Sequence, residues 1–243
     1  MRPAETTLSL ALVLLLSVGG TNAQAQNTHI NDGLALADFP FWQQMSGWWE
    51  SDNTYLDSDM NYLVRSYNSL VHIELTGKRF HEVEHRFYPA GLGASRYGKG
   101  LEKPGEGIEV VVTTTGELLD NSGSLGKIFI DHSASSSGPH VVYRMLGNND
   151  GVRLNTNPKT GVDTYRMYFN FVTPDRRLRS NVGLHSEGEE IGGLRAFILY
   201  RDHRIDASAF EARRAALRQT HNVKMLSVAD PDNPGQSQVT RLD

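Results

Sequence analysis

The strongest constraint on the fold is an alternation of apolar and polar residues with a period of two. It extends from Trp48 to Arg201 and is interrupted by turn residues at intervals of about ten positions. Successive side chains of a β-strand point to opposite faces, so this period is typical of strands with one buried face. Many short strands joined by tight turns indicate a meander. The sequence therefore predicts an all-β, mainly antiparallel fold.

The expected strands are separated by segments with turn chemistry. Thr76-Gly77-Lys78 can close a hairpin, and the segment 148–151 offers residues that tolerate left-handed φ. The strands are expected at 48–56, 62–67, 71–75, 80–87, 108–114, 127–131, 141–146, 164–172, 178–184 and 194–201. Such a sheet must hide its edges, which favours a single meander β-barrel of about 8–10 strands, with a sandwich as the alternative.

The alternation ends after Arg201. Asp206 or Ser208 can cap a C-terminal α-helix whose body, 210–218, is rich in alanine and charged residues. The final residues contain proline, glycine, serine and glutamine, a composition typical of flexible segments. We expect one domain at 39–226, comprising the barrel and the helix, and a flexible tail at 227–243.

The first 25 residues have the pattern of a cleaved secretory signal peptide. Arg2 precedes the apolar stretch 8–16, and Ala23-Gln24-Ala25 supplies small residues for cleavage. The apolar stretch is too short to span a membrane, so we expect no membrane segment in the mature chain. The alternative is an uncleaved N-terminal anchor. The sequence thus predicts a secreted or periplasmic protein.

Composition excludes several classes of function. The chain contains no cysteine, which excludes disulfides and thiolate metal sites. Its formal net charge of −4 argues against a nucleic-acid partner. There is neither a GxGxxG turn nor a P-loop, so no nucleotide cofactor is indicated. Composition does not indicate an oligomeric state.

The run His81-Glu82-Val83-Glu84-His85 matches the H-E-x-x-H pattern of zinc metallopeptidases. In a helix, both imidazoles could bind one zinc ion, whereas in a strand they would lie roughly 13 Å apart. The run follows a hairpin turn and alternates with a period of two, which favours the strand. The zinc metallopeptidase remains an alternative that requires a helix.

On a strand, His81, Val83, His85 and Phe87 share one face, which we predict to be the interior. Glu82 is then an outward residue without a special role. Buried imidazoles need partners. They could form a polar core, or they could contact a ligand as hydrogen-bond donors, as an acid–base pair or as a haem ligand. We predict no cofactor, with haem and zinc left open.

The segment 164–172 presents Arg166, Tyr168 and Asn170 on one face. These side chains could line a pocket and orient a carboxylate or a carbonyl group, although Arg166 and Tyr168 could equally lie at the surface. The run 176–179, which contains three arginines, is interpreted as a solvated turn.

Gly47-Trp48-Trp49, on the first predicted strand, resembles the G-x-W that opens the barrel of lipocalins and their calycin relatives. In that superfamily a basic residue near the last strand packs against the tryptophan, and Arg201 is the candidate for Trp49. The resemblance implies a divergent lipocalin-like barrel with a central cavity for a small lipophilic molecule.

Two classes of function follow from these patterns. The first is a carrier that encloses a small hydrophobic or aromatic molecule, with His81, His85, Phe87, Arg166, Tyr168 and Asn170 as ligand contacts. The second is an enzyme, a lyase, isomerase or hydratase without an organic cofactor. In the enzyme, His81 or His85 would move a proton while Arg166 or Tyr168 holds an oxyanion. The sequence does not decide between them.

Overall fold

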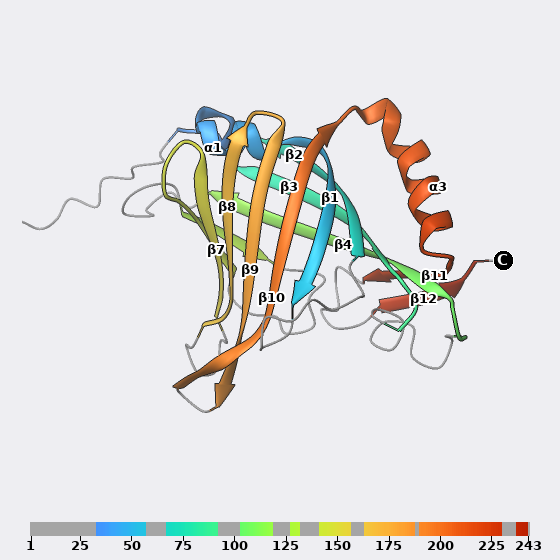
Figure 1. Cartoon of the computed structure of the whole chain (residues 1–243). Helices are drawn as coiled ribbons and strands as arrows, with labels where there is room; N and C mark the ends of the chain where they lie inside the picture. The colour runs from blue at the N-terminus through green and yellow to red at the C-terminus, as the bar shows by residue number, and fades with distance from the viewer. Residues whose placement is uncertain are drawn as a thin grey trace, which may run out of the picture.

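The computed structural model describes residues 33–56, 67–91, 103–118, 127–131, 141–156, 163–187, 190–229 and 237–242, and strands dominate these ranges (Figure 1). The elements in chain order are η1 (Leu36–Asp38), α1 (Pro40–Met45), β1 (Gly47–Leu56), β2 (Tyr67–Thr76), β3 (Arg79–Tyr88), β4 (Gly107–Leu118), β5 (Lys127–Asp131), β6 (Val141–Met145), β7 (Asp150–Thr156), β8 (Asp163–Thr173), β9 (Arg176–Glu187), β10 (Glu190–Ile205), η2 (Ala207–Ala209), α3 (Phe210–Thr220), β11 (Val223–Ala229) and β12 (Ser237–Arg241).

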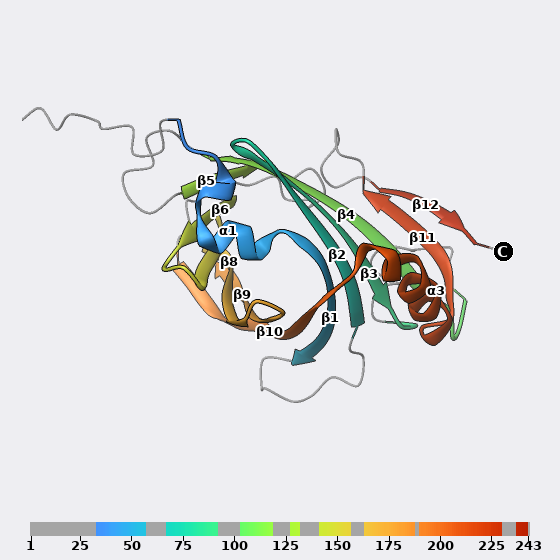
Figure 2. The ribbon, with the colours of Figure 1, turned by 90° about the horizontal axis from the view of Figure 1, so that it is seen from above.

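All of these strands belong to one sheet, in the order β12-β11-β4-β3-β2-β1-β10-β9-β8-β7-β6-β5. Pairing is antiparallel except between β11 and β4, which are parallel. The carboxyl end of β4 also pairs with β5, where Thr115 lies opposite Asp131. The pairings from β4 round to β5 therefore return to β4, and the sheet is strongly curved (Figure 2). The predicted antiparallel all-β fold with a C-terminal helix is confirmed.

Helix α1 covers one end of the curved sheet, on its concave side (Figure 2). Pro40 occupies the first turn, where its missing N–H costs no hydrogen bond. Phe41, Trp42 and Met45 are buried in the main hydrophobic core. A Cβ atom at Gly151 of β7 would collide with the Phe41 ring, so only glycine lets the helix pack this closely.

Helix α3 lies on the convex side of the sheet (Figure 2). Phe210 and Leu217 of this helix pack on Leu70 and Phe87, forming a second hydrophobic cluster. The convex face is therefore buried beneath α3 although it points away from the concave core. Two of the predicted site residues are buried here: Phe87 belongs to this cluster, and His85 contacts Phe210.

Several segments differ from the sequence prediction, including strand β11 at 223–229, where no strand is expected. Strand β7 begins at Asp150, inside a segment interpreted as a turn, because Gly151 permits the close packing of Phe41. Strand β12 pairs with β11 at 237–241, where a flexible tail is expected, because β11 offers it an open edge. The aromatic segment before β1 forms helix α1.

The expected signal peptide lies outside the described residues, as does the expected strand at 62–67 apart from Tyr67. Within the described ranges, the helices are all too short or too polar to span a bilayer.

Candidate functional site

The H-E-x-x-H run lies in strand β3, so the strand prediction is confirmed. Its residues pair with both neighbours: His81 lies opposite Glu74 of β2 and Thr115 of β4. The helix required by the zinc metallopeptidase alternative is not formed. Within the described ranges, no three His, Asp or Glu side chains are grouped to hold a metal ion.

The faces of β3 are the reverse of those predicted. Phe80, Glu82 and Glu84 are buried on the concave side, whereas His81 is exposed on the convex side. The prediction that His81 and His85 face the interior is therefore wrong. A period of two assigns the residues of a strand to two opposite faces. It does not show which face lies inside the barrel when a helix also covers the outside.

His85 and Phe87 lie on the convex face beneath α3. Phe87 is fully buried in the second hydrophobic cluster. The His85 Nδ1 atom is 2.7 Å from Oε1 of Glu109, and the ring contacts Phe210 edge-on. Arg214 and Arg218 of α3 donate to the same Glu109 carboxylate at 2.9 and 2.5 Å. These contacts fasten the helix to the sheet.

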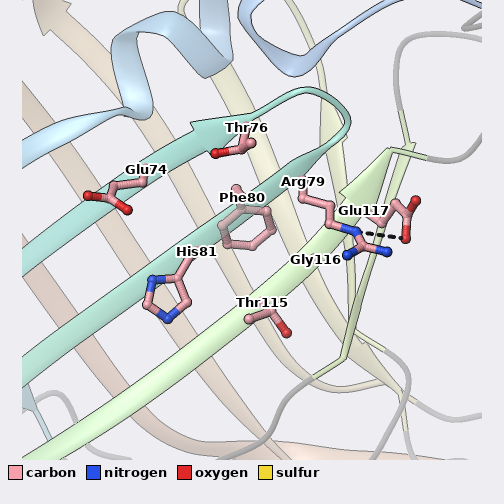
Figure 3. Close-up of a pocket in the computed structure, with 8 residues that line it drawn as sticks. All are labelled: Glu74, Thr76, Arg79, Phe80, His81, Thr115, Gly116 and Glu117. Carbon is pink, nitrogen blue, oxygen red and sulfur yellow. Dashed lines mark ion pairs between the residues drawn. The ribbon is translucent and has the colours of Figure 1, made fainter.

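His81 borders a surface depression of about 500 Å³ at the hairpin end of β2 and β3. Figure 3 shows its lining, in which Glu74 and Thr115 lie beside the imidazole. The Arg79–Glu117 ion pair lies farther away, beyond Phe80 and Thr115. The Arg79 and Glu117 side chains are 76% and 55% exposed, so this pair contributes little to stability. Its lining also includes Phe80, a residue of the concave core.

Arg166, Tyr168 and Asn170 also lie on the convex face, because Met167, Phe169 and Phe171 occupy the concave one. Tyr168 is 44% exposed. Tyr168 and Asn170 border a depression of about 420 Å³ together with Leu178 and Leu199. Strand β8 is not a neighbour of β3, so the predicted ligand contacts do not form one site.

The concave face carries a set of buried arginines, Arg153 of β7 and Arg177 and Arg179 of β9, which we call the arginine layer. Nε of Arg177 and Nε of Arg179 both donate to Oδ2 of Asp202, at 2.5 and 2.6 Å. Burial raises the pKa of Asp202, but the two guanidinium groups outweigh this effect and lower it. Two cations therefore share one carboxylate.

Two glutamates of β3 face the arginine layer. Burial raises the pKa of Glu82, the Glu84 carboxylate raises it further, and the arginines only partly oppose the increase. The pKa of Glu84 is lowered, because the effect of burial is outweighed by Arg86, whose Nη2 lies 2.6 Å from its Oε2. Two carboxyl groups on one strand face thus titrate differently.

Some buried polar atoms on the concave side have no hydrogen-bond partner within the described residues. Nη2 of Arg177, Nε1 of Trp42 and Oδ1 of Asn181 are in this state. An unsatisfied buried donor or acceptor costs about 1–3 kcal/mol. Buried polar groups usually have a protein or water partner, so these atoms are exceptions that call for an explanation.

Aromatic side chains lie on both sides of the arginine layer. Trp42 and Tyr143 pack together at the α1 end, with ring centroids 5.5 Å apart. Tyr67 and Tyr200 come within 3.3 Å through their hydroxyl groups, and Nδ2 of Asn181 lies 3.4 Å from the Tyr200 hydroxyl. The concave side thus combines aromatic surface with buried charge.

The tryptophan expected to stack on a cation does so, but with different partners. The guanidinium carbons of Arg204 and Arg177 lie 4.3 and 4.5 Å from the Trp49 ring centroid. Arg204 also donates to the carbonyl oxygens of Ser46 and Gln44 at 2.7 and 2.9 Å. The prediction of Arg201 is wrong, because this residue bonds Thr54 at the surface.

Sequence reasoning missed the arginine layer. The run that contains Arg177 and Arg179 was interpreted as a solvated turn, yet it lies within β9. The sequence does contain a signal: Arg177, Arg179 and Asn181 alternate with other residues, so they lie on one face of the strand. Arginine is almost never fully buried without a partner, and Asp202, the partner of both arginines, lies on another strand.

The chain has only weak similarity to known proteins. No family model matches the chain, and no curated protein matches it significantly. An S-type phycobiliprotein lyase, CPES, from Guillardia theta has a similar structure, with a TM-score of 0.47 and 14% identity over 74% of this chain and 98% of that one. A DUF3598 protein of unknown function from Nostoc punctiforme PCC 73102 has a TM-score of 0.42 and 12% identity over 67% of this chain and 48% of its own. The function proposed below depends on this chain's own side chains.

Proposed function

We propose that the protein binds, on its concave face, a small molecule that has an aromatic body and an anionic group. The supporting observation is the incompletely satisfied hydrogen-bonding capacity of the arginine layer. Arg177 and Arg179 share the single carboxylate of Asp202, and one N–H group of Arg177 has no partner within the described residues. A ligand carboxylate or a similar anion would accept hydrogen bonds from such groups.

The aromatic part of the proposed ligand follows from the surrounding side chains. Tyr143 and Trp42 lie at the α1 end of the arginine layer, and Tyr67 and Tyr200 form the other aromatic group. Aromatic rings provide large apolar contact areas and favour stacked or edge-on partners. A mostly apolar pocket with a few converging polar groups is the usual form of a small-molecule site.

This proposal retains the expected ligand-binding class but replaces its polar contacts. The convex positions of His81 and His85 remove the basis for histidine acid–base catalysis in the interior. Where side chains are described, no histidine lies on the concave face. The stacking of Arg204 on Trp49 supports the proposed calycin-like barrel, and export after cleavage near Ala23–Ala25 remains part of the proposal.

Two fluorescent probes of matched shape test the proposal. 8-Anilinonaphthalene-1-sulfonate carries a permanent anion, and N-phenyl-1-naphthylamine is its uncharged analogue. We expect the full chain to bind the sulfonate more tightly, because only this probe can pair with the arginine layer. Titration followed by fluorescence gives both dissociation constants. Equal affinity for the two probes would contradict the anionic part of the proposal.

Arg153 is the best residue to replace, because it is not one of the arginines bonded to Asp202. We expect Arg153→Met to weaken sulfonate binding about 10- to 100-fold, corresponding to a lost charge-assisted contact, and to change the neutral probe little. Arg201→Met, on the convex face, is the matched control and should leave both affinities unchanged. Parallel loss of both probes in Arg153→Met would indicate damage to the fold, and circular dichroism would detect it.

A further inference from the structure

The convex face of β8, β9 and β10 carries exposed apolar side chains that lie close together. Tyr168, Leu178 and Leu199 are 44%, 50% and 37% exposed. Tyr168 and Leu199 both lie opposite Ser180, and Leu178 lies two residues before Ser180 on β9. All three border the same depression of about 420 Å³. They therefore form one contiguous group, which we call the convex patch.

The convex patch is uncovered within the described residues. On the same side of the sheet, Phe210 and Leu217 of α3 bury Leu70 and Phe87. Figure 2 shows α3 next to β3, away from β8 and β9. Neighbouring apolar side chains that stay exposed on a protein surface are typical of a site that contacts a partner or a membrane. The convex patch is therefore a candidate interaction surface.

Arginines flank the convex patch. Arg176 lies two residues before Leu178 on β9, so both side chains point to the convex face. Arg144 of β6 lies opposite Val152, which lies opposite Tyr168. Both arginines are exposed, and neither forms an ion pair with a described carboxylate. Their charges are therefore available to an anionic partner.

The acidic residues beside the convex patch are already engaged in hydrogen bonds. Asp150 of β7 and Asp52 of β1 each accept a hydrogen bond from a neighbouring asparagine. The chain as a whole has a formal net charge of −4, so exposed arginines without acidic partners are a local departure from its average charge. The surface that complements the patch is therefore apolar and anionic.

We propose that the convex patch docks the protein onto a membrane surface that contains anionic lipids. Leu178, Leu199 and the Tyr168 ring enter the outer part of the bilayer, while Arg144 and Arg176 contact lipid phosphates. Interfacial binding of this kind combines buried apolar area with electrostatic attraction to anionic lipids, and tyrosine is enriched at membrane interfaces. A fluid bilayer adapts to a convex surface, whereas a rigid protein partner would need a matching concave one.

Vesicle co-sedimentation tests this proposal. The chain from Gln26 is used, which is the form expected after signal-peptide cleavage, because the apolar stretch 8–16 would itself bind lipid. This chain contains every residue that the structure describes. We expect it to bind vesicles of phosphatidylcholine mixed with phosphatidylglycerol, and to bind pure phosphatidylcholine vesicles about 10-fold more weakly or less. High salt should weaken binding to the mixed vesicles.

Matched variants assign the binding to the convex patch. Arg176→Gln should weaken binding to the mixed vesicles about 5-fold, whereas Arg79→Gln, which removes an exposed arginine elsewhere, should not. Leu178→Ser should also weaken binding about 5-fold, through lost apolar contact. Val228→Ser, which removes an exposed apolar side chain of β11, is its control and should leave binding unchanged.

Three results would overturn the inference. The first is no binding of the unmodified chain to the mixed vesicles, and the second is unchanged binding in Leu178→Ser. The third is a dimer, detected by light scattering, that Leu178→Ser dissociates, because the convex patch would then bind a second copy of the chain. Circular dichroism confirms that each variant is folded. None of these results concerns the arginine layer, which the sulfonate and neutral probes test separately.

Discussion

At the scale of single residues, Gly47 allows the contact between Arg204 and Trp49. Its φ of +102° lies in a region that side chains rarely adopt. A Cβ atom there would also lie 2.5 Å from Nη1 of Arg204. We expect Gly47→Ala to lower the free energy of unfolding by about 2–3 kcal/mol, because it adds backbone strain and displaces the guanidinium group. Urea denaturation measures this loss.

Gly77 is the matched control for this prediction. It also has a positive φ, +57°, but a Cβ atom would meet nothing within 4 Å. Gly77→Ala should therefore cost only the backbone component, about 1 kcal/mol. Equal losses in the two variants would show that the approach of Arg204 contributes nothing. The double variant Gly47→Ala with Arg204→Ala would reveal their coupling as a departure from additivity.

At the scale of elements, helix α3 is held to the sheet through Glu109. This carboxylate is fully buried and accepts hydrogen bonds from Arg214 and Arg218. Burial raises the pKa of Glu109, but His85 and the two arginines outweigh it and lower the pKa to about 2. We expect Glu109→Gln to cost about 2 kcal/mol at pH 7, since the two arginine side chains, 21% and 33% exposed, can turn to solvent. Urea denaturation gives this value.

The pH dependence of this contribution has a defined sign. The folded-state pKa of about 2 lies below the ordinary value of 4.5, so the contribution is complete above pH 4.5. It is lost progressively as pH falls toward 2. The difference in stability between wild type and Glu109→Gln should shrink over this range. Glu211→Gln, whose carboxylate is 76% exposed, is the control and should show little difference at any pH.

At the scale of the whole molecule, a single hydrophobic core contains residues of helix α1 and of strands as far along the chain as β11. We therefore expect the whole molecule to unfold cooperatively, with the same urea midpoint by far-UV circular dichroism and by tryptophan fluorescence. The chain has three tryptophans. Trp42 and Trp49 lie in the main core, and Trp48 contacts the cluster beneath α3, so they report on both sides of the sheet.

A variant that retains only Trp48 makes this test sharper. Its fluorescence follows the α3 side alone, through the contacts of Trp48 with Phe210 and His72. If the sheet and α3 unfold together, its fluorescence and circular dichroism midpoints will coincide. An earlier fluorescence midpoint would show that α3 detaches before the sheet unfolds.

Much of the fold could be predicted from local patterns. The strand at 127–131 was predicted with the observed bounds, and the body of the predicted helix, 210–218, lies within α3. Period-two alternation and helix composition are properties of neighbouring residues, so one chain reveals them. Strands β7 and β11 and helix α1 were missed. For β7 and α1, the contact of Gly151 with Phe41 joins segments far apart in the sequence.

The candidate site could be predicted far less well. The sequence by itself determined that β3 is a strand and that its histidines and glutamates occupy opposite faces. Only the tertiary structure decided which face is inside, because α3 covers the convex side and buries His85 and Phe87 there. The tertiary structure also placed Asp202 between Arg177 and Arg179, which makes their burial tolerable. Alternation is encoded locally, whereas the burial of charge depends on partners from other strands.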